Sequence, residues 1–176
     1  MATPTVRLDA WIKLDVPMVR QRQTKCCWAA CCESFTGFYN QHIKGQYEYI
    51  LICKGGFQEG MAERVHRGAN EYAIPTEYIS LLQTMMGTSL RLAEPGRGAD
   101  VRPSQDSIKL TLKNGRIFIF TSRNHARILC GYGVKPGGTE DGLYCMDPEQ
   151  DRIAWEPWSL YDCCTSLIWL PKGKFA

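Results

Sequence analysis

Apolar residues recur with a helical spacing in the first part of the chain and give way to strand-like runs after residue 115. Apolar side chains at every third or fourth position are typical of one face of an amphipathic helix. They predict helices at 27–39, 46–53, 75–86 and 104–114, with a weaker helix near 60–70. In the last stretch we expect Ile108, Leu110 and Leu112 to anchor the helix in the core.

The second part consists of short runs rich in aromatic and β-branched residues, separated by turn residues, which is typical of antiparallel strands. We predict strands at 116–120, 125–132, 143–146, 152–155 and 165–170. The stretch 94–103, rich in glycine, proline and charge, predicts a loop, and residues 1–20 an irregular lead-in. Helices first and antiparallel strands second indicate an α+β fold.

The length of the chain fits one domain with a substantial core. We expect this domain to span residues 1–176, with a helical part at about 21–114 and a sheet part at about 115–171. A hydrophobic content of 44% and a charged content of 22% are those of a globular protein. The net charge of +3 comes from scattered basic residues, so neither nucleic acid nor membrane is an expected partner.

The sequence gives no sign of membrane insertion or signal-dependent secretion. No apolar run approaches the roughly 18 residues that a membrane helix needs. The N-terminal residues lack a charged head followed by an apolar core, so we expect no secretory signal peptide. The protein is therefore expected to be made in the cytoplasm, and any export would use a route without such a signal.

Nine cysteines are many for a cytoplasmic protein, and their positions fit neither a disulfide framework nor a zinc site. Three adjacent pairs disfavour a framework, because neighbouring cysteines rarely bridge without strain. Cys27 and Cys31 are four apart, and no second pair with the spacing of zinc ligands follows. We expect most cysteines to be small buried hydrophobes in a reduced protein without a metal.

The segment from Gln21 to Ala30 contains two parts that an acyl-transfer site needs. Cys27 begins a predicted helix, and a helix N-terminus favours the thiolate form that makes a cysteine nucleophilic. Gln21, six residues earlier, can supply a side-chain N–H that would form an oxyanion hole with the backbone N–H of Cys27. Gln23 is a rival for this role, although its spacing of four to Cys27 is short.

His125 is the histidine best placed to serve such a cysteine, since it begins an apolar strand at the rim of the predicted sheet. Asp147 follows the next strand, and an antiparallel hairpin would bring it close to His125 as the partner that orients the imidazole. The Asp-Pro dipeptide could instead simply begin a turn, and Asp151 is a weaker rival. His42 and His66 lie in polar settings and are expected to be exposed to solvent.

Five sequence blocks occur in the order found in papain-like cysteine peptidases, which this chain resembles. They are Gln21, Cys27-Trp-Ala-Ala, Gly115-Arg-Ile-Phe-Ile-Phe, His125-Ala…Gly131-Tyr and Asp147-Pro. Over roughly residues 15–150 the chain is similar to the compact bacterial branch, with its avirulence-type effector proteases and bacteriocin-processing peptidase domains of exporters. The resemblance implies a papain-like fold, in which an N-terminal helical part packs its nucleophile helix on a C-terminal antiparallel sheet.

The resemblance also implies roles for single residues and no cofactor. The roles are nucleophile for Cys27, general base and acid for His125, orienting acid for Asp147 and oxyanion donor for Gln21. In this branch the cysteine directly precedes a tryptophan, which favours Cys27 over Cys26. Loss of the nucleophile should therefore reduce activity far more than loss of Gln21, because one oxyanion donor contributes about 10²–10³-fold.

Two residues depart from the pattern of these peptidases. Cys26 stands before the nucleophile, where an aromatic residue is commoner, and this leaves open which thiol reacts. Arg127 interrupts an otherwise apolar strand. We expect Arg127 to face solvent, with contact to a substrate or partner as the alternative.

The residues and the resemblance together predict a cysteine endopeptidase that cleaves a protein or peptide through a thioester intermediate. The resemblance further implies a bacterial effector or toxin, delivered into a target cell by a specialised secretion system and held by a cognate inhibitor or immunity protein at home. Two alternatives stay open. One is a deamidase, transglutaminase or acyltransferase with the same residues, and the other is an inactive papain-like binding module.

Overall fold

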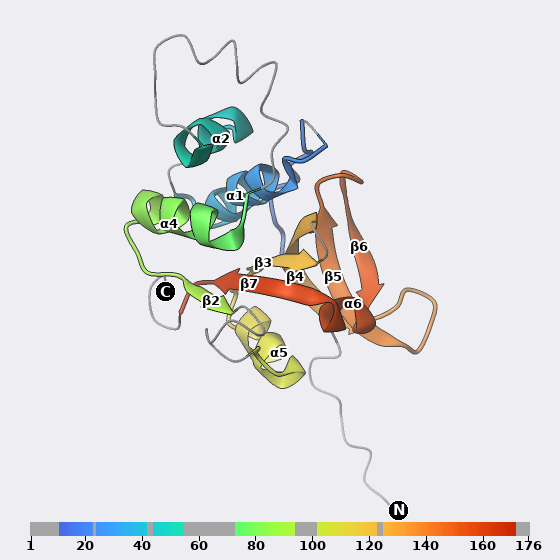
Figure 1. Ribbon diagram of the computed structural model, residues 1–176. Coiled ribbons are helices and arrows are strands. Elements are labelled where there is room, and N and C mark those ends of the chain that lie inside the picture. The colour runs from blue at the N-terminus through green and yellow to red at the C-terminus, as the bar shows by residue number, and fades with distance from the viewer. Residues whose placement is uncertain are drawn as a thin grey trace, which may run out of the picture.

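Helices precede most of the strands along the part of the chain that the structure describes (Figure 1). The computed structural model describes residues 11–22, 24–41, 44–54, 73–93, 102–122 and 125–171. The helices are α1 (Cys27–Phe38), α2 (Gln46–Lys54), α4 (Pro75–Met86), α5 (Gln105–Lys113) and α6 (Ser159–Asp162). The strands are β1 (Ile12–Lys13), β2 (Arg91–Ala93), β3 (Phe118–Ser122), β4 (His125–Val134), β5 (Asp141–Asp147), β6 (Arg152–Pro157) and β7 (Cys164–Trp169).

The described strands form one antiparallel sheet with helices on both faces. The strand order is β2-β7-β3-β4-β5-β6, and β1 pairs with β4 outside this path. Figure 1 shows α1, α2 and α4 on one side of the sheet and α5 on the other. The predicted α+β fold is confirmed, and the helix that begins at Cys27 packs on the sheet as expected.

Strand β3 shows why the run after residue 115 is apolar without interruption. Ile117 and Ile119 belong to the hydrophobic cluster beneath α1, whereas Phe118 and Phe120 belong to the cluster beneath α5. Successive side chains of a strand point to opposite faces, so a strand covered by helices on both faces needs apolar side chains at every position. The sheet is therefore the middle layer of the molecule.

Helix α1 is buried on nearly all sides, which fixes the position of its first residue. Ala29 and Ala30 are fully buried, and Trp28 stacks on Tyr78 of α4 with ring centroids 5.9 Å apart. A helix that is apolar all round belongs in the interior of a protein. Cys27 therefore stands at a helix N-terminus that its neighbours hold firmly against the sheet.

The helices at 27–39, 46–53, 75–86 and 104–114 are confirmed, with small shifts at some ends. Ser104 caps α5, because its side chain accepts a hydrogen bond from the backbone N–H of Ser107 at 3.2 Å. One predicted anchor is wrong: Leu110 is 60% exposed, whereas Ile108 and Leu112 are buried. Residues two apart on a helix do not share a face, so Leu110 points away from the core.

All five predicted strands are present, but three short elements, β1, β2 and α6, were missed. β1 lies within the predicted irregular lead-in, and none of the three is long enough to show a periodic pattern. The helix predicted near 60–70 and most of the predicted loop 94–103 fall outside the described residues, as do His42, His66 and Gln23. In the part that is described, no helix combines the length and apolar character needed to span a membrane.

Candidate active site

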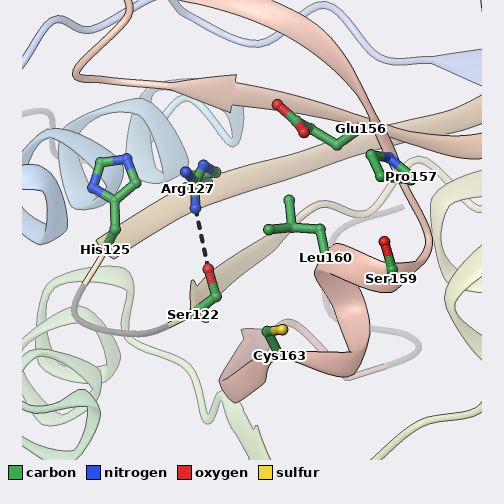
Figure 2. Close-up of a pocket in the computed structure, with 8 residues that line it drawn as sticks. All are labelled: Ser122, His125, Arg127, Glu156, Pro157, Ser159, Leu160 and Cys163. Atoms are coloured by element: carbon green, nitrogen blue, oxygen red, sulfur yellow. Dashed lines mark hydrogen bonds between the residues drawn. The ribbon is translucent and has the colours of Figure 1, made fainter.

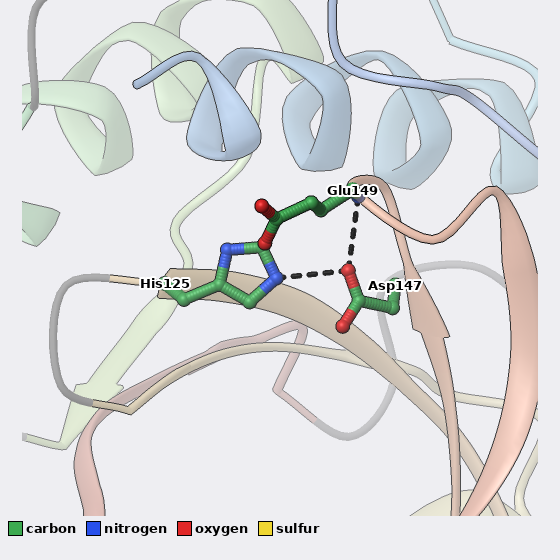
Figure 3. Close-up of side chains that lie close together, drawn as sticks. All are labelled: His125, Asp147 and Glu149. Carbon is green, nitrogen blue, oxygen red and sulfur yellow. Dashed lines mark hydrogen bonds and ion pairs between the residues drawn. The ribbon is translucent and has the colours of Figure 1, made fainter. Parts of the chain in front are cut away.

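The hairpin of β4 and β5 brings His125 and Asp147 together at one end of the sheet (Figure 3). His125 is the first residue of β4 and Asp147 the last of β5, and the two strands run antiparallel. His125 Nε2 lies 2.9 Å from Asp147 Oδ1. The proximity expected from the sequence is confirmed, whereas the rival Asp151 lies exposed in the turn that follows.

Cys27, the first residue of α1, lies next to the start of the strand that His125 begins. The backbone N–H of Ala126 donates a hydrogen bond to Cys27 Sγ at 3.3 Å, and Cys27 is only 3% exposed. Asp147 occupies Nε2 of His125, so Nδ1 is the ring nitrogen left to interact with Cys27, which also raises the pKa of His125. The thiol, imidazole and carboxylate therefore lie in the order that an activated nucleophile requires.

Burial and charge act on His125 in opposite directions. Burial lowers the pKa of the imidazole, but hydrogen bonds and charge interactions with Asp147 and Cys27 raise it more, from 6.5 to about 9. For Asp147, burial raises the pKa of the carboxyl, but His125, the backbone N–H of Glu149 and the charge of Arg127 hold it well below its usual range. At neutral pH an ionised carboxylate thus faces a protonated imidazole beside Cys27.

Comparison with known proteins agrees with this geometry. The sequence profile of papain-like cysteine protease AvrRpt2 matches residues 10–161. The chain belongs to the AvrRpt2 family of papain-like cysteine proteases. It is therefore a cysteine protease, and the matched range contains every residue discussed above as nucleophile, base, acid or oxyanion donor.

A solved structure agrees with the AvrRpt2-family assignment at the level of the fold. The crystal structure of UfSP from C. elegans superposes with a TM-score of 0.53 at 11% sequence identity. The match covers 92% of the AvrRpt2-family chain but only 34% of the UfSP chain, so this chain spans about a third of that protein. A comparison with curated protein sequences finds no significant match.

Arg127 of this AvrRpt2-family protease does not face solvent, and that expectation from the sequence is wrong. Its side chain is 17% exposed, and its Nε donates to Asp147 Oδ2 at 2.9 Å. Its Nη1 donates to Ser122 Oγ at 3.1 Å. A lone arginine two residues after the histidine was the available signal, but the predicted hairpin did not show the register of the two strands or that the arginine side chain turns toward the carboxylate.

Gln21 lies beside the site, with its backbone N–H donating to the carbonyl of Pro148 at 2.9 Å. Its side-chain Nε2 donates to the carbonyl of Thr24 at 3.3 Å, near the long limit for such a bond. Its Oε1 is buried and has no hydrogen-bond partner in the described part of the chain. Gln21 is thus close to the residue that follows Asp147, and its role as oxyanion donor stays a prediction.

The cysteines of the AvrRpt2-family chain fall into different environments. All nine have free thiols, and all are buried except the half-buried Cys53 and the exposed Cys163. Burial and the neighbouring Cys27 raise the pKa of the Cys31 thiol well above its usual value, so this thiol stays protonated and unreactive. Cys26 is also buried, and Cys163 is the thiol that reagents will reach most easily.

A pocket of about 470 Å³ opens next to His125 and Arg127 (Figure 2). Its lining comes from β3, β4, β6, α6 and the residue that follows α6, and consists of Ser122, His125, Arg127, Glu156, Pro157, Ser159, Leu160 and Cys163. Figure 2 shows the hydrogen bond between Arg127 and Ser122 in this lining. The exposed thiol of Cys163 therefore shares a pocket with the imidazole, and labelling experiments have to account for it.

His125, Asp147 and Glu149 are the group in the described ranges whose donor atoms could hold a metal ion, since these atoms lie within 4.8 Å of one another. Figure 3 shows that Asp147 Oδ1 already accepts hydrogen bonds from His125 Nε2 and from the backbone N–H of Glu149, each at 2.9 Å. An ion here would have to displace the contact between imidazole and carboxylate. We therefore assign these residues to the candidate active site and not to a metal centre.

We expect the cleavage rate to fall as the pH rises through about 9, because His125 then loses the proton that the leaving amine needs. Since the pKa of His125 is raised on folding, its interactions stabilise the fold fully below 6.5, and this contribution is lost as the pH rises through about 9. Initial rates and thermal melts at stepped pH would measure both effects. A rate that still increases beyond about pH 10 would contradict the assignment.

Proposed function

We propose that this protease cleaves a protein or peptide substrate with Cys27 as nucleophile, His125 as general base and acid, and Asp147 as the residue that orients His125. The observation that carries the proposal is the position of His125, whose Nε2 lies 2.9 Å from Asp147 Oδ1, while the backbone N–H of the next residue, Ala126, donates to Cys27 Sγ. The family supports the reaction class, and the geometry supports these residues.

The proposed reaction has two steps. The proton of the Cys27 thiol resides on His125 in the ion pair that starts the reaction, and the thiolate attacks the carbonyl carbon of the scissile peptide bond. His125 then donates the proton to the leaving amine as the C–N bond breaks, which leaves a thioester on Cys27. In the second step His125 deprotonates a water molecule, the hydroxide attacks the thioester, and the acid product and Cys27 are released.

The backbone N–H of Cys27 and the side chain of Gln21 are proposed to stabilise the oxyanion formed in both steps. Gln21 Nε2 now donates to the carbonyl of Thr24 at 3.3 Å. In the proposal this weak bond is exchanged for a bond to the oxyanion, while the backbone contact of Gln21 with Pro148 keeps the residue in place. Each such donor contributes about 10²–10³-fold.

The biological setting proposed here is that of a bacterial effector or toxin delivered into a target cell by a specialised secretion system, with a cognate inhibitor or immunity protein in the producing cell. Membership of the AvrRpt2 family supports this setting, because avirulence-type effector proteases belong to the branch of papain-like peptidases that the chain resembles. The active site supports only the chemistry. The substrate in the target cell is proposed to be a protein.

Comparative proteomics tests the proposed function. Cells or lysates exposed to the wild-type protease should show new protein N-termini that are absent after exposure to Cys27→Ala. The two proteins differ by one buried sulfur atom, so both samples are exposed to the same foreign folded protein except for the thiol of Cys27. A mass change on glutamine side chains with no new N-termini would instead identify a deamidase or transglutaminase. The absence of both changes would indicate a binding module.

A further inference from the structure

Arg127 is the one Lys or Arg side chain on strand β4, and it connects three neighbouring strands of the sheet. It stands on β4 and bonds to Ser122 of β3 on one side and to Asp147 of β5 on the other. Two hydrogen bonds fix the plane of its guanidinium group, since Nε and Nη1 donate to acceptors on different strands. A planar guanidinium held in this way can hold a carboxylate in one orientation, which a lysine ammonium does less well.

We propose that Arg127 is a positioning residue that fixes the rotation of the Asp147 carboxylate so that Oδ1 faces His125; this inference rests on the proposed function. The two carboxylate oxygens have separate donors. Oδ1 accepts from His125 Nε2 and from the backbone N–H of Glu149, each at 2.9 Å. Oδ2 accepts from Arg127 Nε at 2.9 Å and, at a longer 3.4 Å, from the side-chain Nε2 of Gln150.

Without Arg127, the side chain of Gln150 would be the remaining described donor to Oδ2. The carboxylate could then turn about its Cβ–Cγ bond, and its alignment with His125 would be lost for part of the time. Misplacement of a reacting group by about 1 Å can cost on the order of 10²-fold in rate. A buried ion pair is by itself weak support for stability, so stabilising the fold alone does not account for this arginine.

Arg127 also lines the pocket beside His125, together with Glu156, and this raises substrate binding as the competing role. The two roles have different kinetic signatures. A residue that positions Asp147 affects the chemical step and therefore kcat. A residue that binds substrate equally in the ground and transition states affects KM and leaves kcat unchanged.

The test compares Arg127→Met, Arg127→Lys and a matched control, Arg116→Met. Arg116 is also a half-buried arginine whose side chain donates to a protein acceptor, the carbonyl of Leu170 at 3.3 Å, but it lies at the other end of β3. All rates are measured per active site, by titration with an irreversible thiol reagent in a Cys163→Ser background. The exposed Cys163 then does not consume the reagent, and a thermal melt of each variant verifies that the titrated protein is folded, because an unfolded chain would expose further thiols.

We expect Arg127→Met to lower kcat by about 10- to 100-fold with little change in KM, and Arg127→Lys to recover part of the loss because its charge remains. Arg116→Met should keep the kcat of the background protein. The alkylation rate of Cys27 should fall in Arg127→Met, since the aligned imidazole that supports the thiolate is lost part of the time.

Two results would overturn this inference. An unchanged kcat per active site in Arg127→Met would show that Asp147 keeps its orientation without the arginine. A higher KM at unchanged kcat would assign Arg127 to substrate binding. Either result is distinguishable from failure of the proposed function itself, because in that case the wild-type protein would not cleave the substrate, or Cys27→Ala would cleave it as fast as the wild type.

Discussion

Cys27→Ala is expected to reduce peptide cleavage by at least about 10³-fold, because the covalent step has no other nucleophile in the same position. Cys27 is the cysteine whose sulfur accepts a hydrogen bond from the Ala126 backbone N–H and whose charge and hydrogen bond act on His125. The residue also begins α1, where the helix dipole favours a thiolate. Steady-state rates with a peptide or protein substrate measure the effect.

Cys26→Ala is the matched control, since it removes the same atom one residue earlier. Cys26 is buried just before α1, and its replacement should cost about 1 kcal/mol of stability while most of the activity remains. Alkylation followed by mass spectrometry, in a Cys163→Ser background, should label Cys27 before the other cysteines. An inactive Cys26→Ala together with an active Cys27→Ala would transfer the nucleophile role to Cys26.

Features that depend on neighbours in the sequence could be predicted. The helical spacing of Trp28, Cys31 and Phe35 predicted α1, and all three side chains are buried. The apolar strand that His125 begins and the strand before Asp147 predicted the hairpin, because antiparallel strands that follow one another usually pair. This one pairing was sufficient to predict that the histidine and the acid lie close together.

Features that depend on strand register, on side-chain orientation or on very short elements could not be predicted. Arg127 was expected in solvent, because the predicted hairpin gives neither the strand register nor the direction of the side chain that together bring Arg127 to Asp147 and Ser122. The hydrogen bond of Gln21 to Thr24 depends on a side-chain rotamer, which no spacing rule gives. β1 consists of two residues, and a segment of that length carries no periodic signal.

His125→Ala is expected to lower kcat/KM by about 10²–10⁴-fold, because the imidazole serves as base for Cys27 and as acid for the leaving amine. The fold should persist, since Asp147 keeps the hydrogen bonds from Arg127 Nε and the Glu149 backbone N–H that hold its carboxylate. The alkylation rate of Cys27 should also fall near neutral pH, because the thiolate loses the charge that stabilises it. A thermal melt of the variant would verify that it is folded.

The double variant Cys27→Ala/His125→Ala decides whether the two residues act in one step. Residues that act as a unit have strongly non-additive effects, so the double variant should be no less active than Cys27→Ala alone. Two independent contributions would instead multiply, and the residual rate would fall by a further factor of about 10² or more. Multiplication would mean that His125 serves a step that does not involve Cys27. Equality would place the thiol and the imidazole in the same transition state.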